Sequence, residues 1–223
     1  MIKKLVIFDL DGTLLDTSGD LCDAMNAMLE FYGFPHITVE QAKAYIGNGA
    51  KNFVIRSLPV GCEIPIEECL KKYNEIYNSS GSPKTALYDG IDVLLKNLKM
   101  DGAMLAIASN KPQPSMDEVY KRYLKQYDFD YVYGNRPCFA HKPDKECGEF
   151  ILNELGVLPE NAVVVGDGET DVRFAENLGC TGIAVTWGYR DKKVLTDAGA
   201  KIFADSASEL YDIIKEFLNG ELR

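Results

Sequence analysis

Short apolar runs that each end at polar or charged residues constrain the fold of this chain more than any other feature. They cover residues 5–8, 104–108, 162–165 and 182–185. Continuous apolar runs of this length are typical of strands that are buried on both faces of a parallel sheet. We expect a fifth strand over 201–204 and a short extra strand over 131–133.

Helical patterns separate these runs. They cover residues 91–100, 116–126, 145–155, 171–178 and 207–218. Strands that alternate with single helices form βαβ units. The sequence therefore predicts an α/β fold built on a doubly wound parallel sheet.

One long segment, residues 16–84, breaks this alternation. It shows helical patterns over 21–32, 39–45, 50–58 and 66–78, but no clear strand. Residues 78–83 (Asn-Ser-Ser-Gly-Ser-Pro) have the composition of a linker. An insertion of this length can pack as its own small helical bundle. We expect a core domain formed by 1–15 and 85–223, and a helical domain formed by 16–84.

Acidic residues gather after the predicted strands. Asp9 and Asp11 follow the first strand, and Asp167 and Asp171 follow the strand over 162–165. Ligands of open α/β sheets bind at these strand ends. A single Asp there is better explained by a turn or a helix cap, but the joint pattern is harder to obtain from capping alone. Two unit charges about 4 Å apart cost about 4 kcal/mol at an effective dielectric of 20, so such a cluster requires a cation.

The other metal-ligating residues narrow the choice of cation and of cellular compartment. The six cysteines are scattered, with no CxxC pair and no Cys/His ligand spacing: Cys22, Cys62, Cys69, Cys138, Cys147 and Cys180. Ligation by oxygen alone favours Mg²⁺ over Zn²⁺. Unpaired cysteines and the lack of a signal-like or membrane-spanning segment predict a cytoplasmic protein.

The net charge of -10 and the pI near 4.8 argue against binding to nucleic acid or to a membrane surface, because both require a basic face. Local cations and backbone amides must therefore hold any anionic substrate.

Four segments resemble the four motifs of the haloacid dehalogenase superfamily. In order they are Asp9-Leu10-Asp11-Gly12-Thr13-Leu14-Leu15-Asp16, Ser109-Asn110-Lys111-Pro112, Lys142-Pro143-Asp144 and 166–171. Their order and spacing match over nearly the whole chain. The helical insertion is similar to the C1-type cap of the phosphoglycolate phosphatase-like subfamily.

This resemblance implies a covalent mechanism. Asp9 is the expected nucleophile that forms an aspartyl phosphate, and Asp11 is the expected general acid and base. Lys142 is expected to offset charge on the nucleophile and on the transferring phosphoryl group. The resemblance also implies that Asp9, the backbone carbonyl of Asp11 and Asp167 hold Mg²⁺, with Asp171 supporting the ion directly or through water.

Other residues of the motifs are candidates for substrate binding. Ser109 or Asn110 is expected to bind phosphate through a hydroxyl or a backbone N–H, and Gly12 and Thr13 are expected beside the phosphate. Gly12 also lets the chain leave its strand sharply. Lys111 is either a phosphate contact or a surface cation, and the sequence does not decide between them.

The segment Gly47-Asn48-Gly49-Ala50-Lys51 lies between two predicted helices of the insertion. Two glycines around an Asn are explained by a helix end and turn. The alternative is a loop that reaches the active site, with Asn48, Gly49 and Lys51 as substrate contacts. Lys51 is the expected contact for a phosphate or carboxylate.

Together these observations predict a Mg²⁺-dependent phosphatase, a monomer or homodimer, that hydrolyses a small phosphate monoester such as phosphoglycolate or a sugar phosphate. A β-phosphoglucomutase-like phosphomutase and a pyrophosphatase are the alternatives.

Overall fold

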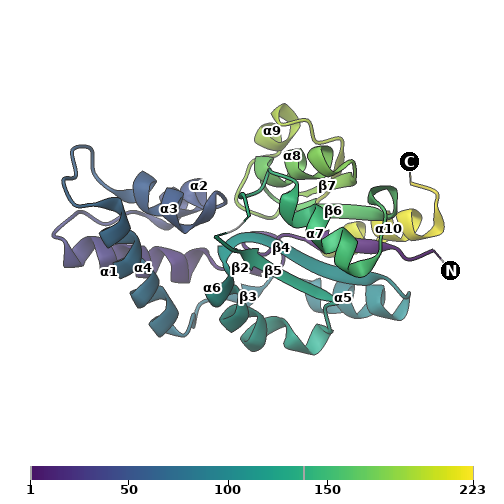
Figure 1. The fold of residues 1–223 in the computed structure, drawn as a ribbon, viewed down its shortest axis with the longest axis horizontal. Coiled ribbons are helices and arrows are strands. Elements are labelled where there is room, and N and C mark those ends of the chain that lie inside the picture. Colours follow the sequence, from purple (N-terminus) through teal and green to yellow (C-terminus); the bar gives the residue numbers. More distant parts are fainter. Residues whose placement is uncertain (1, 138, 223) are drawn as a thin grey trace.

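A parallel sheet forms the centre of the computed structural model, which describes residues 2–137 and 139–222 (Figure 1). Within these residues the sheet has six strands in the order β5-β4-β1-β6-β7-β8, and all neighbours are parallel. The strands are β1 (Leu5–Phe8), β4 (Met104–Pro112), β5 (Tyr131–Asn135), β6 (Ala162–Gly166), β7 (Thr181–Val185) and β8 (Ile202–Ala204). The predicted α/β fold is confirmed. Cys138, one of the six scattered cysteines, lies outside the described residues.

The register of the central strands brings their carboxyl ends to one edge. Phe8 of β1 lies between Ile107 of β4 and Val165 of β6. Asp9, which follows β1 directly, therefore reaches the same edge as Asp167, which follows β6. Parallel strands in register place residues that are distant in sequence side by side in this way.

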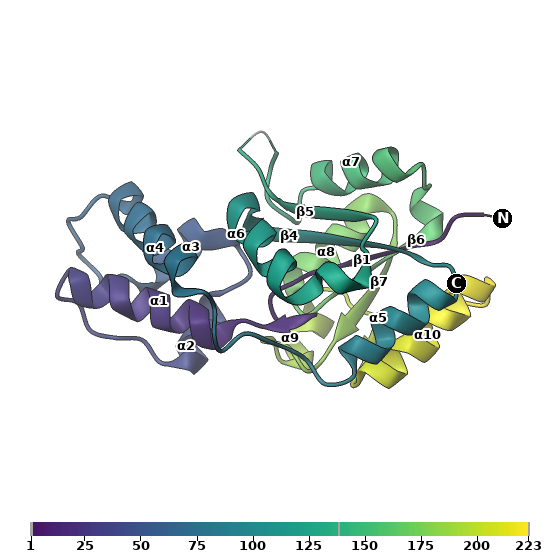
Figure 2. The same cartoon turned by 90° about the horizontal axis from the view of Figure 1, so that it is seen from below.

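Alternate residues of β1 enter two different cores. Val6 and Phe8 pack in the cluster that contains residues of α5 (Ile91–Met100) and α10 (Ala207–Asn219). Leu5 and Ile7 face α7 (Glu146–Leu155) and α8 (Glu169–Leu178). Figure 2 shows α5 and α10 on the opposite side of the sheet from α7. Burial on both faces explains why the strand is apolar throughout rather than alternating.

The helices of the core domain differ from the prediction in two places. The pattern over 116–126 is divided into α6 (Gln113–Val119), one π-helical turn (Tyr120–Leu124) and a 3-10 turn (Lys125–Tyr127). Helix α9 (Lys192–Asp197) was not predicted. It has six residues, of which only Leu195 is buried, so no amphipathic period marks it in the sequence.

The insertion forms a helical cap with its own core. Its helices are α1 (Ser18–Phe31), α2 (Val39–Tyr45), α3 (Gly49–Ser57) and α4 (Ile66–Ser80). They bury a cluster that includes Met25, Met28, Phe53, Val54 and Tyr73. Figure 1 shows these helices beside one end of the sheet. The two connections to the core pair as a short antiparallel ribbon of β2 (Leu15–Asp16) and β3 (Ala86–Leu87), next to the predicted boundaries.

The predicted linker over 78–83 is partly helical. Helix α4 continues to Ser80 and ends at Gly81, whose φ of 72° is left-handed. The Ser79 and Ser80 hydroxyls donate to the carbonyls of Ile76 and Tyr77, at 2.9 Å and 2.8 Å. Both hydroxyls are therefore hydrogen-bonded within the last turns of the helix rather than in a flexible linker.

Among the described residues, we find no helix with both the length and the apolar character that a membrane span requires.

Candidate active site

The turn after β1 depends on Gly12. Its φ of +90° is left-handed, and a Cβ atom there would lie 2.3 Å from Oδ2 of Asp167. Any other residue would therefore strain the backbone and also push Asp167 out of place. Gly12 was predicted as a substrate contact, and the structure shows it packed against the side chain of Asp167, which follows the neighbouring strand β6.

Three carboxylates meet where β1 and β6 end. Oxygen atoms of Asp9, Asp167 and Asp171 lie within 4.8 Å of one another. The Nζ atom of Lys142 donates to Asp9 at 2.8 Å and to Asp171 at 2.6 Å. It also donates to the carbonyl of Ala108 at 2.6 Å. The structure thus brings together the predicted nucleophile, the predicted lysine and two predicted metal ligands.

Neighbouring groups fix the orientation of Asp167. The Thr13 hydroxyl donates to its Oδ1 atom at 3.1 Å, and the backbone N–H of Tyr189 donates to Oδ2 at 2.7 Å. Gly188 allows this approach, because a Cβ atom there would lie 2.2 Å from the Cβ atom of Asp167. Thr13, predicted beside the phosphate, here positions a metal-ligand candidate.

The cluster has more negative than positive charge. Burial is the main cause that raises the pKa of Asp9 to about 7; Lys142 opposes this rise, and Asp171 adds to it. Burial likewise raises the pKa of Asp167 to about 8, with further increases from Asp9 and Asp171. For Lys142, burial alone would lower the pKa, but the carboxylates of Asp171 and Asp9 outweigh it and the net shift is upward. One lysine does not neutralise three clustered carboxylates, so the donor set fits a hard divalent cation such as Mg²⁺.

This imbalance predicts a pH-dependent effect of Mg²⁺ on stability. The pKa values of Asp9 and Asp167 are about 7 and about 8, whereas that of an ordinary Asp is 3.8. Between the ordinary value and the raised values, the metal-free folded chain therefore binds more protons than the unfolded chain. Its stability should therefore fall as the pH rises through that window. A bound cation favours the ionised carboxylates, so Mg²⁺ should raise the melting temperature more at about pH 8 than at about pH 5.

Thermal melts in EDTA and in Mg²⁺ at constant ionic strength would measure this difference. The Asp167→Asn variant should show a smaller Mg²⁺ effect at about pH 8, because an amide has no negative charge with which to hold the ion. An equal Mg²⁺ effect at both pH values in the wild-type protein would contradict the prediction.

Asp11 lies apart from this cluster. Its carboxylate accepts from Nζ of Lys111 at 3.1 Å and 3.3 Å and from the Thr17 hydroxyl at 2.6 Å. Lys111 is buried, and its Nζ atom lies 4.7 Å from the centre of the Tyr77 ring of α4. Burial alone would lower the pKa of Lys111, but Asp11 and Tyr77 together outweigh burial and the net shift is upward. Of the two predictions for Lys111, an exposed surface cation is excluded.

Asn110 organises the carboxyl end of β4. Its side-chain oxygen accepts from the backbone N–H of Lys142 at 2.8 Å. Its side-chain nitrogen donates to the carbonyls of Lys142 and of Gly47 in the cap, both at 3.1 Å. The amide therefore ties three segments together. Ser109 is buried, and its hydroxyl accepts from the N–H of Lys111 at 3.2 Å.

The predicted cap loop contacts the core. Asn48 accepts from the Thr170 hydroxyl at 3.2 Å, and a Cβ atom on Gly49 would lie 2.5 Å from the His141 ring. Lys51 points elsewhere: its Nζ atom pairs with Glu67 at 2.9 Å, and both side chains are more than half exposed. Its role in substrate recognition stays a prediction.

The sequence analysis missed contacts made by Tyr189 and Arg190. The Tyr189 hydroxyl accepts from the N–H of Thr17 at 2.9 Å, next to the first connection between the core and the cap. Arg190 donates to the carbonyl of Lys43 at 2.7 Å and to that of Ile46, and it pairs with Glu169 at 3.1 Å. Both residues follow β7, so reading the end of that strand as closely as the others would have found them.

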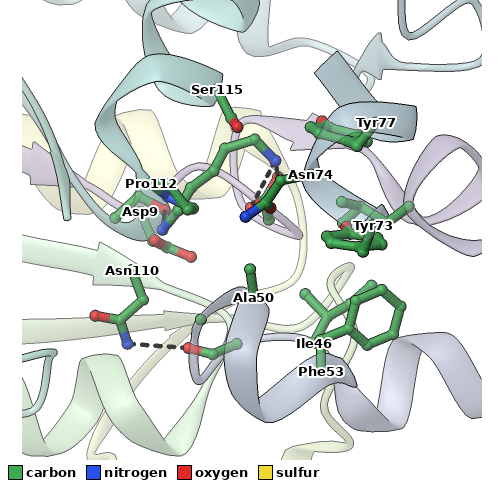
Figure 3. A pocket seen from close by; sticks show the side chains of 16 residues that line it. Asp9, Ile46, Ala50, Phe53, Tyr73, Asn74, Tyr77, Asn110, Pro112 and Ser115 are labelled. Carbon is green, nitrogen blue, oxygen red and sulfur yellow. Dashed lines mark hydrogen bonds and ion pairs between the residues drawn. The ribbon is translucent and has the colours of Figure 1, made fainter. Parts of the chain in front are cut away.

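A pocket separates the cap from these strand ends (Figure 3). Asp9, Asp11 and Asn110 line one side of it. Ile46 and Phe53 line the side that belongs to the cap. The cap therefore closes over the carboxylates, and a substrate at Asp9 would contact both domains.

A motif profile of the haloacid dehalogenase-like hydrolases matches residues 6–185. The chain belongs to this family. The predicted superfamily is therefore confirmed.

Similar proteins match over most of their length. A protein of Pseudomonas aeruginosa named phosphoglycolate phosphatase 1 is 33% identical over 219 residues, which cover 94% of this chain and 79% of the relative. The phosphoglycolate phosphatase of Aliivibrio fischeri is 29% identical and covers 95% and 96% of the two chains. A protein of Lactobacillus delbrueckii subsp. bulgaricus whose crystal structure is known is 31% identical in sequence. Its structure matches with a TM-score of 0.87 and covers 96% of this chain and 99% of its own. CbbY of Rhodobacter sphaeroides, solved in complex with phosphate, is 25% identical, with a TM-score of 0.78 and coverage of 94% and 96%.

Proposed function

We propose that this chain is a Mg²⁺-dependent phosphatase that hydrolyses small phosphate monoesters through an aspartyl phosphate on Asp9. The observation that supports this most is the arrangement at the end of β1. One oxygen of Asp9 is held by Lys142 at 2.8 Å, Asp167 and Asp171 lie beside it, and Asp11 faces the same pocket. Relatives named phosphoglycolate phosphatase support the same activity.

In the first step a carboxylate oxygen of Asp9 attacks phosphorus, and the bond from phosphorus to the leaving oxygen breaks. Asp11 gives its proton to that oxygen, so the leaving group departs as an alcohol. Lys142 stabilises the negative charge that spreads over the transferring group, because its ammonium group is fixed in a buried site.

In the second step Asp11 takes a proton from water, and the water oxygen attacks phosphorus. The bond between phosphorus and Asp9 breaks, which releases inorganic phosphate and restores the carboxylate. Asp9 and Asp167, with Asp171 beside them, would hold Mg²⁺, and a bound Mg²⁺ supplies positive charge that offsets the phosphoryl oxygens.

The cap supports a preference for small substrates. It covers the strand ends and is bound to the core by Asn110, Thr170 and Arg190, so it must open to admit a substrate and close to exclude water. The five scattered free cysteines of the described chain support our proposal of a reducing compartment, the cytoplasm.

Release of inorganic phosphate from p-nitrophenyl phosphate tests this proposal. We expect turnover with Mg²⁺, its loss in excess EDTA and its recovery when Mg²⁺ is restored. Ca²⁺ should support turnover poorly, because its larger and more variable ligand shell does not impose the octahedral geometry of Mg²⁺. Full activity in excess EDTA would contradict metal dependence, and no phosphate release from any monoester would contradict the proposed activity.

A further inference from the structure

The loop after β7 places Tyr189 next to two parts of the site. Its backbone N–H donates to Oδ2 of Asp167 at 2.7 Å, and its side chain packs against the hydrophobic cluster of the cap. Its hydroxyl lies 3.2 Å from Oγ1 of Thr17, whose own hydroxyl donates to Oδ1 of Asp11 at 2.6 Å. Tyr189 thus contacts a metal-ligand candidate through its backbone and, through Thr17, the proposed acid and base.

The Thr17 hydroxyl serves Asp11 rather than the helix that follows it. A threonine directly before a helix usually caps it with its side chain. Thr17 precedes α1, but in the described chain its hydroxyl makes no capping bond. A hydroxyl has one proton, and Thr17 gives it to Asp11, so the 3.2 Å contact requires a proton from Tyr189. Burial, and then the charge of Asp11, raise the pKa of Tyr189, so its hydroxyl keeps that proton.

Asp16 is another acceptor within reach of the Tyr189 hydroxyl, at 3.3 Å. The same Asp16 oxygen already accepts from the backbone N–H and the hydroxyl of Ser18, at 3.0 Å and 2.6 Å. Thr17, in contrast, meets the Tyr189 hydroxyl with two groups, its backbone N–H at 2.9 Å and its Oγ1 atom. The tyrosine is therefore better placed to orient Thr17 than to orient Asp16.

From this chain of contacts we propose that Tyr189 is a positioning residue for proton transfer: its hydroxyl orients Thr17, and Thr17 holds Oδ1 of Asp11. A carboxyl group that accepts at Oδ1 can carry its proton on Oδ2, so these contacts persist when Asp11 is protonated for the first step. Lys111 can remain at Oδ1, 3.1 Å away. Oδ2 is then the oxygen that donates to the leaving alcohol. This inference rests on the proposed phosphatase activity.

The Tyr189→Phe variant tests the hydroxyl, because it keeps the ring and the backbone N–H that holds Asp167. n-Butyl phosphate has a leaving group that requires a proton, so its kcat/KM should fall by about 10-fold, a part of the roughly 10²- to 10⁴-fold that general acid catalysis contributes. For p-nitrophenyl phosphate, whose leaving group is stable without a proton, the fall should be less than about 2-fold. Tyr211→Phe is the matched control: its hydroxyl donates to Asp101 at 2.8 Å on an exposed part of α10, and its loss should affect neither ester.

Further variants test whether the tyrosine acts through Thr17 and Asp11. Thr17→Val should show the same selective loss, and Thr17→Ser, which restores a hydroxyl, should recover most of it. In the Asp11→Asn background, Tyr189→Phe should lower kcat/KM for n-butyl phosphate no further, because residues that act through the same group are not additive. Tyr189→Phe should also keep the wild-type effect of Mg²⁺ on the melting temperature, since Asp167 keeps its bond.

The outcomes separate this inference from the proposed function. An equal loss of kcat/KM for the two esters in Tyr189→Phe would overturn the inference and assign the hydroxyl to cap closure or to folding. A wild-type kcat/KM for n-butyl phosphate, or a further loss of about 10-fold in the Asp11→Asn background, would overturn it as well. In all these cases the wild-type protein still releases phosphate, so the phosphatase activity stands. If it released none from either ester, the proposed function would fail and this inference with it.

Discussion

Asp9→Asn should lower phosphate release by about 10⁴-fold or more, as expected for the loss of a covalent nucleophile. An amide oxygen is a far weaker nucleophile than a carboxylate, and the substituted side chain also loses a charge that would bind Mg²⁺. Neither Asp11 nor Lys142 can replace it, because Asp11 is held by Lys111 and Thr17 and Lys142 is a cation. The measurement is kcat with p-nitrophenyl phosphate in saturating Mg²⁺.

The variant should remain folded, and this separates catalysis from stability. Asp9 is partly buried close to two other carboxylates, which is unfavourable when all are ionised, so an amide there removes repulsion. The melting temperature in EDTA should therefore be equal to or higher than that of the wild-type protein. Asp92→Asn is a matched control, because Asp92 pairs with Lys96 on an exposed part of α5 and should not affect turnover. If Asp9→Asn kept more than a few per cent of the wild-type rate, the covalent mechanism would be wrong.

The sheet and the carboxylate cluster were predictable because they depend on local sequence and one topological rule. Buried parallel strands require continuous apolar runs, and such runs ending at Asp9 and Gly166 mark where the polar edge begins. Once the strands are taken as parallel, Asp9 and Asp167 must lie at the same edge. The order of the strands along the chain was sufficient to place these two carboxylates together, although the order of the strands across the sheet was not predicted.

The cap side of the pocket was not predictable in the same way. Ala50 and Phe53 are three residues apart on α3 and line the pocket together, whereas Lys51 is rotated by about 100° from Ala50 and pairs with Glu67. The sequence shows that α3 is amphipathic, but not how it is turned against the core. That rotation depends on long-range contacts such as those of Arg190 with the end of α2, which no local pattern reports.

Asp11→Asn should have an effect that depends on the leaving group. An Asn cannot donate the proton that an alkoxide requires, so kcat/KM for n-butyl phosphate should fall by about 10²- to 10⁴-fold. p-Nitrophenolate is stable without a proton, so kcat/KM for p-nitrophenyl phosphate should fall much less. The first step, transfer of the phosphoryl group to Asp9, governs kcat/KM for both substrates.

The second step gives this variant a further signature. Both substrates form the same aspartyl phosphate, and its hydrolysis requires Asp11 as the base that activates water. The variant should therefore accumulate phosphorylated enzyme with p-nitrophenyl phosphate, seen as a rapid burst of one equivalent of p-nitrophenol followed by slow turnover. The position of Asp11 supports both roles, because Lys111 and Thr17 hold its carboxylate at the pocket and apart from the cluster of Asp9, Asp167 and Asp171. An equal loss of kcat/KM for the two substrates, with no burst, would assign Asp11 to metal binding or to folding instead of proton transfer.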